Sequence, residues 1–313
     1  MNISFFMPAY NCSETIEESV NSIIEGNFSE GDELVIVNDC STDNTDEILQ
    51  KIHNKYPFIK IIHNSRNKGG AATRNVAVES CKHPILFCLD SDNVLCPNSI
   101  DKLKIFMEQK NADVASFAEL FYFRRDVSKI DYKWTFKTGI HTIEDHLSTK
   151  LVPAASGNYM FTKESWIKAG QYPEFAGALD TWGFGLRQVM TGANIYVMPN
   201  SFYYHRYSNE SYWMRDAESR KASISLRALQ LLIPFFDLID DRDINYIMSS
   251  KGRYTWFNNL NKRLIRIAIK TKENPIWSVS KSQNQYSEDS LDKKLVGISK
   301  KVIKKILGLL AMK

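Results

Sequence analysis

The stretch Pro84-Ile85-Leu86-Phe87-Cys88-Leu89-Asp90-Ser91-Asp92 is an apolar run that ends abruptly in two carboxylates. Its hydrophobicity is nearly continuous, as expected of a strand in a parallel sheet that is covered on both faces. Two carboxylates directly after such a strand repel each other unless a cation lies beside them. Carboxylate oxygens on a tight turn suit Mg²⁺ or Mn²⁺, which keeps open positions for phosphate oxygens. The alternative interpretation is a polar turn whose acids cap the next helix.

Similar apolar runs recur in the first third of the chain, separated by segments with helical periodicity. Strands are predicted at Ile3–Met7, Glu33–Val37, Phe58–Ile62 and Pro84–Leu89, and helices at Glu14–Glu25, Asn44–Lys55 and Gly69–Ser80. Ser13 and Thr42 lie just ahead of the first two helices and are predicted to cap them. Strands that alternate with helices predict an α/β fold with a doubly wound, mostly parallel sheet. Ligands of such sheets bind at the carboxyl ends of the strands.

The rest of the chain is less regular. Beyond Pro97 the pattern predicts one more helix, a helix at Thr181–Thr191, and strands at Asp113–Phe123, Asn158–Thr162, Asn194–Val197 and Ser201–Tyr207. Residues 125–155 are predicted to be irregular. Beyond Tyr212 the pattern is helical to about Ile269, and the polar segment Ser278–Asp292 is typical of a linker.

Composition and charge exclude several classes of protein. The 313 residues carry a formal charge of +4, but Lys293–Lys313 holds seven Lys and no acid, which leaves −3 on the rest. A mildly acidic body argues against general nucleic-acid binding, which needs a basic face on the folded domain. The five cysteines are odd in number and form no CxxC pair. We therefore expect a reducing cytoplasm, without a disulfide framework or structural zinc. A signal-peptide pattern and an apolar run long enough to span a membrane are both lacking.

Polar motifs also follow the other three strands predicted in the first third. They are Pro8-Ala9-Tyr10-Asn11, Asn38-Asp39-Cys40-Ser41-Thr42-Asp43 and Asn67-Lys68-Gly69-Gly70, the last followed by Arg74-Asn75. Asp39 could accept a hydrogen bond from a ring N–H of a nucleobase near Tyr10, or it could belong to a simple turn. Free N–H groups at Gly69-Gly70 could face a phosphate. Arg74 could lie at the surface or project toward the base. Neither GxGxxG nor a P-loop is present.

Together with Asp90-Ser91-Asp92, these motifs resemble those of family 2 glycosyltransferases of the GT-A fold, over roughly the first two thirds of the chain. The resemblance implies an inverting enzyme that uses a nucleotide-sugar donor, usually UDP-linked, with Mn²⁺ or Mg²⁺. By position, it implies that Asp39 and Arg74 bind the base, that Asp90 binds the ribose or the metal, and that Asp92 binds the metal. The expected donor-binding residues also include Pro8, Tyr10 and Ser91. The tripeptide Asn38-Asp39-Cys40 departs from the Asp-Asp-Gly that is commoner in the family, which could change the donor preference.

The resemblance also implies a catalytic base in the second part of the chain. Inversion by direct displacement needs a carboxylate that takes the proton of the acceptor hydroxyl. The family supplies this base from an acidic pair at the start of a helix, and the matching segment Gly177–Arg187 holds one acid, Asp180. We therefore expect Asp180 to be the base. The alternative is that Asp180 is only a helix N-cap.

Four further residues are candidates for the acceptor and diphosphate sites. Asn158 belongs to Ser156-Gly157-Asn158, which resembles the acceptor-side floor of the family. Trp182 could stack on an acceptor sugar or be a core residue. His205 could complete the metal or diphosphate site, although a lone His is more often structural. Arg206 would suit the diphosphate if it points inward.

The expected domain organisation follows from these motifs. We expect a glycosyltransferase domain at 1–212, with a nucleotide-sugar half (1–96) and an acceptor half (97–212), then a helical extension (213–277), a linker (278–292) and a basic amphipathic helix (293–313). Apolar residues of the last segment recur at helical spacing opposite its Lys residues, which predicts binding to an anionic membrane surface. Packing on the enzyme's own body and an oligomer contact are the alternatives.

The sequence therefore predicts a metal-dependent, inverting sugar transfer from a nucleoside diphosphate, expected to be UDP. The expected acceptor is a hydroxyl of a glycan or lipid-linked molecule in surface polysaccharide synthesis, at the cytoplasmic face of the cell membrane. A catalytically inactive relative that binds glycans or nucleotides is the alternative from another class, because the second acid beside Asp180 is missing. A sugar nucleotidyltransferase is a further alternative, but Pro8–Ser13 is not the Gly-rich triphosphate loop that it would need.

Overall fold

The computed structural model describes the whole chain except residues 149–151, 209–211, 213–220 and 250–313. The predicted linker (278–292) and basic amphipathic helix (293–313) therefore lie outside the described residues. The end of the predicted helical extension (213–277) lies outside them as well. Within the described part, no helix is long and apolar enough to cross a membrane.

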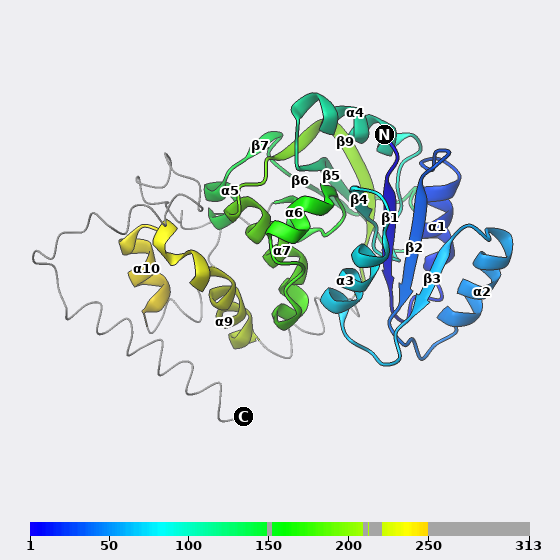
Figure 1. Ribbon diagram of the computed structural model, residues 1–313, viewed down its shortest axis with the longest axis horizontal. Coiled ribbons are helices and arrows are strands. Elements are labelled where there is room, and N and C mark those ends of the chain that lie inside the picture. The colour runs from blue at the N-terminus through cyan, green and yellow to red at the C-terminus, as the bar shows by residue number, and fades with distance from the viewer. Residues whose placement is uncertain (149–151, 209–211, 213–220, 250–313) are drawn as a thin grey trace, which may run out of the picture. The chain divides into compact units, whose positions relative to one another are not determined.

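Four parallel strands form the first half of the sheet, on the right in Figure 1. They are β1 (Ser4–Ala9), β2 (Glu33–Asn38), β3 (Lys60–His63) and β4 (Ile85–Cys88), in the spatial order β3-β2-β1-β4. The helices that connect them are α1 (Ile16–Ile24), α2 (Thr45–Lys55) and α3 (Gly70–Ser80). The β1 and β2 strands are buried almost throughout, as strands covered on both faces must be. This half confirms the predicted alternation of strands and helices.

The second half adds strands of both directions. Its elements up to β8 are α4 (Ser99–Lys110), β5 (Val114–Phe123), β6 (Tyr132–Thr135), β7 (Gly139–His141), α5 (Ile143–Ser148), the 3-10 helix η1 (Pro153–Ala155) and β8 (Met160–Thr162). They are followed by α6 (Lys163–Lys168), the 3-10 helix η2 (Glu174–Leu179), α7 (Asp180–Met190), β9 (Ile195–Arg206), α9 (Lys221–Leu232), η3 (Ile233–Leu238) and α10 (Asp241–Met248). The described part of the predicted helical extension is therefore helical, and α9 packs against η2 and α7.

The two halves are joined through β8, which lies between β4 and β5 and is antiparallel to both. The β4 and β5 strands therefore run in the same direction. On its other side, β5 pairs with β9 in parallel along its whole length. Beyond the residues that pair with β8, the carboxyl half of β5 pairs with β6. The β6 strand consequently lies at the carboxyl end of the sheet, where the predicted site residues follow β1, β2 and β4.

Several local predictions were wrong. Residues 125–155, predicted to be irregular, contain β6, β7 and α5. The two strands predicted at the end of the domain form one strand, β9, because its register with β5 shifts near Pro199-Asn200 instead of breaking. Ser13 and Thr42 do not cap helices: α1 begins at Ile16 and α2 at Thr45, and neither helix has a side-chain cap. The Thr42 N–H instead donates to Asn11 Oδ1 at 2.8 Å, which ties the β1 and β2 loops together.

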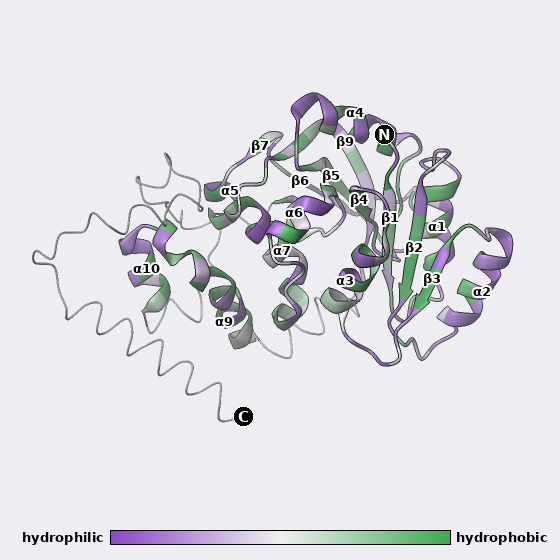
Figure 2. Ribbon diagram, viewed as in Figure 1, coloured by the Kyte–Doolittle hydropathy of each residue, from purple (hydrophilic) through white to green (hydrophobic). Residues whose placement is uncertain are grey.

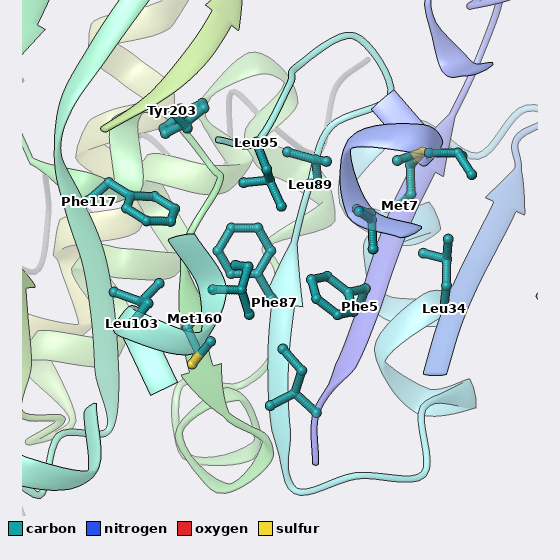
Figure 3. Packing of buried hydrophobic residues seen from close by; sticks show 14 of the residues in the cluster. Phe5, Met7, Leu34, Phe87, Leu89, Leu95, Leu103, Phe117, Met160 and Tyr203 are labelled. Atoms are coloured by element: carbon teal, nitrogen blue, oxygen red, sulfur yellow. The ribbon is translucent and has the colours of Figure 1, made fainter. Parts of the chain in front are cut away.

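An apolar core runs across the sheet (Figure 3). Phe5 of β1 contacts Phe87 of β4, Phe87 contacts Phe117 of β5, and Phe117 contacts Tyr203 of β9, with ring centroids 5.9–6.1 Å apart. Burying each such side chain stabilises the fold by about 1.5–3 kcal/mol. The colouring of Figure 2 agrees, since β2 is green along most of its length while α2 carries many purple residues. This continuous core fixes the strands whose carboxyl ends carry the polar motifs.

Candidate active site

The loops after β1 and β2 form one edge of the candidate site. The Asp39 N–H donates to Ala9 O at 2.8 Å, which joins the two strand ends. The buried Asp39 carboxylate accepts from the N–H groups of Lys68 and Gly69, both at 2.9 Å, and from Asn64 Nδ2 at 2.8 Å. Asp39 thus anchors the start of α3, and Gly69 there has φ +85°, a backbone conformation that favours glycine.

The other two donor residues predicted from this edge are accessible to different degrees. Pro8 is half-buried within β1, whereas Tyr10 lies just beyond the strand and is 40% exposed. An exposed aromatic ring next to Asp39's loop is available to a ligand. A carboxylate has about four lone-pair positions. The three bonds that Asp39 accepts within the protein therefore leave room for one more.

A buried arginine joins the acids of the two halves. Arg74 of α3 donates from Nη2 to Asp90 Oδ1 at 2.6 Å and from Nη1 to Asp180 Oδ2 at 2.7 Å. Asp90 follows β4 and Asp180 opens α7, so residues 90 positions apart in sequence meet on one guanidinium. Burial alone would lower the pKa of Arg74, but the charges of Asp180 and Asp90 raise it well above its ordinary value. Arg74 therefore stays charged and keeps the two carboxylates together.

Asn158, predicted to bind the acceptor, is fully buried and holds Asp90 instead. Its Oδ1 accepts from the Asp90 N–H at 2.7 Å, and its Nδ2 donates to Asp90 Oδ2 at 3.1 Å. The preceding Gly157 has φ +77°, and a β-carbon there would lie 2.9 Å from Thr181 Cγ2 and 3.5 Å from Asp90 Oδ2. A glycine is thus required for this loop to reach the acid. In this structure Asn158 positions Asp90.

The loop that carries Ser91 and Asp92 is fixed by main-chain contacts. Thr15 Oγ1 donates to Ser91 O at 2.9 Å, and Arg206 Nε donates to Asp92 O at 3.0 Å. Arg206 also donates from Nη1 to Arg124 O at 2.9 Å and from Nη2 to Glu18. The N–H groups of its guanidinium therefore donate to protein acceptors and fix the shape of the loop. The sequence predicted a contact of Arg206 with the diphosphate.

The electrostatics of this loop suit a cation. Burial and then the charge of Asp90 raise the pKa of Asp92 to about 7, and the positive charges of Arg206 and Arg74 offset this rise only in part. His205 is different: burial lowers its pKa to about 4, and its Nδ1 lies 3.2 Å from the Tyr203 hydroxyl. A neutral His205 held by Tyr203 is positioned by the protein itself.

The predicted metal ligands Asp90, Asp92 and His205 do not converge on one point. In the part of the chain that the structure describes, no group of three or more His, Cys, Asp or Glu side chains could hold a metal ion. The reason is that Asp90 is held by Arg74 and Asn158, and His205 by Tyr203. Mg²⁺ in phosphate sites, however, is commonly bound through only one or two carboxylates plus the substrate. The Asp92 carboxylate is a candidate for such a single protein ligand, whereas Asp90 would first have to release Arg74 or Asn158.

Trp182 of α7 is buried, with 3% of its surface exposed, so its ring does not face a ligand in this structure. Two contacts were missed from the sequence: the bridge made by Arg74 and the clamp made by Asn158. The sequence signal for the first was available, since Arg74 is the only charged residue among Ala71-Ala72-Thr73 and Val76-Ala77-Val78. A lone cation on an otherwise small and apolar helix face is expected to meet a buried partner.

Comparison with solved structures shows the fold. A structure of Staphylococcus aureus TarS 1-349 in complex with UDP-GlcNAc matches with a TM-score of 0.62 and 22% identity, over 83% of this chain and 74% of that chain. A mannosyltransferase from Pyrobaculum calidifontis, in complex with GDP-Man and Mn²⁺, matches with a TM-score of 0.51 and 16% identity, over 73% of this chain and 64% of that chain. Both likenesses support the predicted GT-A α/β architecture.

Comparison of sequences shows the family. The poly(ribitol-phosphate) beta-N-acetylglucosaminyltransferase TarS of Staphylococcus aureus (strain Mu50 / ATCC 700699) is 24% identical over 283 residues, which are 88% of this chain and 48% of that protein. The chain thus spans about half the length of this curated relative. The model of the family described as glycosyl transferase family 2 matches residues 4–170, more than half of the chain. With its parallel strand ends, its paired acids and this match, the chain belongs to glycosyl transferase family 2.

Proposed function

We propose that this protein transfers a sugar from a UDP-linked donor, of the hexose or N-acetylhexosamine type, to a hydroxyl of a glycan or lipid-linked acceptor in surface polysaccharide synthesis. The observation that carries the proposal is the meeting of Asp90 and Asp180 on Arg74 at the carboxyl end of the sheet. Desolvation offsets much of the attraction within a buried ion-pair network, so stability alone is a weak explanation for these acids and a functional role is favoured. The UDP-GlcNAc complex of the related TarS supports the choice of nucleotide.

The donor is proposed to lie along the ends of β1, β2 and β4. Pro8, Tyr10 and Asp39 would contact the nucleobase. Arg74 would reach the nucleobase only by releasing the carboxylate of Asp90 or Asp180. Asp90 and Ser91 would meet the ribose and diphosphate. Asp92 and Asp90 would hold Mn²⁺ or Mg²⁺, which when bound neutralises the leaving diphosphate. Arg206 would contribute indirectly, by shaping the Asp92 loop.

Asp180 is the proposed general base. Its Oδ1 accepts from the Thr181 N–H at 2.8 Å and its Oδ2 from Arg74 at 2.7 Å, so the carboxylate has a fixed orientation. Burial raises the pKa of Asp180, with Arg74 acting in the opposite direction. A raised pKa makes the carboxylate a stronger base toward an acceptor hydroxyl. The proton of that hydroxyl would pass to Asp180 as the oxygen attacks the anomeric carbon from the face opposite the diphosphate, which inverts the configuration.

The place of action belongs to the same proposal. The basic amphipathic segment 293–313 would hold the enzyme at the anionic inner surface of the cell membrane, near lipid-linked acceptors. Sedimentation of the full chain and of a chain lacking residues 293–313 with phosphatidylglycerol vesicles tests this. Equal sedimentation of the two would remove the membrane contact.

The main experiment measures donor binding and transfer. A panel of nucleotide sugars, each with and without Mn²⁺, should raise the melting temperature with UDP-linked members only. At a hundredfold excess over Kd the stabilisation is about 2.7 kcal/mol. Asp92→Ala should lose the Mn²⁺-dependent part, and Asp180→Asn should keep donor binding but lower turnover by about 10²–10⁴-fold. The control Asp101→Asn removes an exposed acid of α4 and should change neither.

Two outcomes would contradict the proposal in different ways. Unchanged turnover in Asp180→Asn would reject Asp180 as the base. If UDP-sugars bind but neither transfer nor donor hydrolysis occurs with the wild type, the inactive binding relative becomes the better description.

A further inference from the structure

An aromatic surface lies on the β6 edge strand and the end of β9. Tyr132 and Trp134 of β6 are 43% and 38% exposed, and all four residues of this strand are exposed. Tyr207, just beyond β9, is half-buried beside them, with its ring centroid 5.4 Å from that of Tyr132. We call the rings of Tyr132, Trp134 and Tyr207 the aromatic platform. Among the described strands β6 pairs only with β5, so this surface has no sheet partner on its outer side.

Contacts with neighbouring side chains hold the rings of the platform in place. The ring of buried Tyr122 stacks on Tyr132 with centroids 4.4 Å apart and an interplanar angle of 12°, and it lies 5.4 Å from the ring of Trp134. The Tyr207 hydroxyl accepts from Arg124 Nε at 2.8 Å and donates to Asp131 at 3.0 Å. Rings fixed in this way lose little conformational entropy when a ligand stacks on them.

A chain of direct contacts links the platform to the candidate active site. Tyr122 pairs across the sheet with both Tyr132 and His205, so the three side chains share one face. The Tyr122 and His205 rings are 4.6 Å apart, His205 Nδ1 lies 3.2 Å from the Tyr203 hydroxyl, and that hydroxyl lies 3.4 Å from Asn158 Nδ2. Asn158 in turn holds Asp90. The platform therefore continues the face on which the acids are gathered.

The strand order separates the platform from the proposed nucleotide site. The loops after β1 and β2 lie on one side of β4, whereas β5, β6 and β9 lie on the other. A ligand on the platform thus approaches Asp90 from the side opposite the proposed nucleobase site. This is the side from which an acceptor must come if the donor lies along β1 and β2.

The charges around the platform favour a neutral ligand. Three of the nearby cations are paired with acids: Arg124 with Asp131, Lys129 with Asp126 and Lys133 with Glu119. Rings with an apolar face and a polar tip, flanked by paired charges, match the alternating apolar faces and hydroxyl edges of a sugar ring.

We infer that the aromatic platform is a stacking site for a sugar ring of the acceptor glycan. The side chains of His205, Tyr203 and Asn158 lie between this ring and the reacting hydroxyl. The inference rests on the proposed glycosyl transfer and adds to it the part of the acceptor that is recognised. It assigns Tyr132, Trp134 and Tyr207 to binding and to no chemical step.

The test uses the full chain and an array of bacterial surface oligosaccharides as the probe. The wild type should bind a subset of them, and Trp134→Ala and Tyr132→Ala should each weaken that binding by at least about tenfold. The matched control is Phe58→Ala, which removes a 54% exposed aromatic ring at the opposite end of the sheet, just before β3. It should leave glycan binding unchanged. Trp134→Gln is a second variant, in which the ring is replaced by a polar side chain that suits an exposed edge strand.

Donor binding is measured on the same samples by the UDP-GlcNAc melting shift, which every platform variant should retain. Glycan binding within twofold of the wild type in both Trp134 variants and in Tyr132→Ala would overturn the inference. So would a wild type that shows the UDP-GlcNAc shift but binds no oligosaccharide of the array. The absence of any nucleotide-sugar shift would instead reject the proposed transfer, so the two failures are distinguishable.

Discussion

Replacing Arg74 tests whether one guanidinium holds the two halves of the site together. In Arg74→Met, Asp90 and Asp180 lose donors at 2.6 and 2.7 Å, and their side chains are only 23% and 4% exposed. Removing one partner of a buried pair costs about 3–5 kcal/mol, because the remaining charge is uncompensated. Met keeps much of the aliphatic volume beside Tyr172, over which the guanidinium lies at 5.9 Å. We therefore expect the free energy of unfolding to fall by about 3–5 kcal/mol.

The assay is urea unfolding at pH 7 of the wild type, Arg74→Met, Asp180→Asn and the double variant. The double variant should be more stable than the two single changes predict by addition, by about 1–3 kcal/mol, because residues in one ion-pair network couple. Arg187→Met on α7 is the control: Arg187 donates to Gly170 O at 3.3 Å and pairs with no acid of the described residues. It should cost no more than about 1 kcal/mol. Strict additivity, with an Arg74→Met cost no larger than that of Arg187→Met, would refute the reasoning.

Two further predictions concern the second half of the domain. His146 of α5 is fully buried, and burial, with a smaller effect of His141, lowers its pKa to about 4. In the unfolded chain, the imidazole of His146 takes up a proton near pH 6.5, whereas in the folded protein it stays neutral to about pH 4. The contribution of His146 to stability is therefore present above pH 6.5 and is lost as the pH falls toward 4, by about 2 kcal/mol between pH 7 and 5. Urea midpoints across this range should show the loss and His146→Leu should lessen it, whereas a flat wild-type profile would contradict a buried neutral imidazole. At Gly185 of α7 an added β-carbon would overlap that of Ala154 in η1, so Gly185→Ala should destabilise the fold by about 1–3 kcal/mol. Thermal melting checks this, with partial recovery expected in Gly185→Ala combined with Ala154→Gly.

The sequence predicted the elements whose signal is continuous hydrophobicity, and it missed those that lack such a signal. Parallel strands such as β2 are buried on both faces and stand out as apolar runs. By contrast, β6 is exposed at all four positions and β7 has three residues, so neither leaves a recognisable run. The sequence predicts separate strands before and after Pro199-Asn200, whereas the structure has one strand, β9, whose register with β5 shifts there.

The candidate site divides in the same way. The strand ends that carry Asp39, Asp90 and Asp92 follow from the rule that ligands bind at the carboxyl ends of parallel strands. The partners of these acids depend on tertiary contacts over long separations, such as the 68 residues between Asn158 and Asp90. Nothing local in the sequence encodes that distance, so Asn158 was expected to face an acceptor and instead holds an acid.

The position of β8 has a consequence for the growing chain on the ribosome. The β4 strand pairs with β1 on one edge. Its other edge pairs with β8 (Met160–Thr162), which is synthesised about seventy residues later. At roughly 5–20 residues per second, the apolar edge Ile85–Cys88 stays open for about 4–14 s after it is made. During translation, the nucleotide half therefore presents an unpaired strand edge that other nascent chains could join. Because the strand that closes this edge is also the one that follows Asn158, the sheet is sealed and Asp90 is clamped by the same few residues as they emerge.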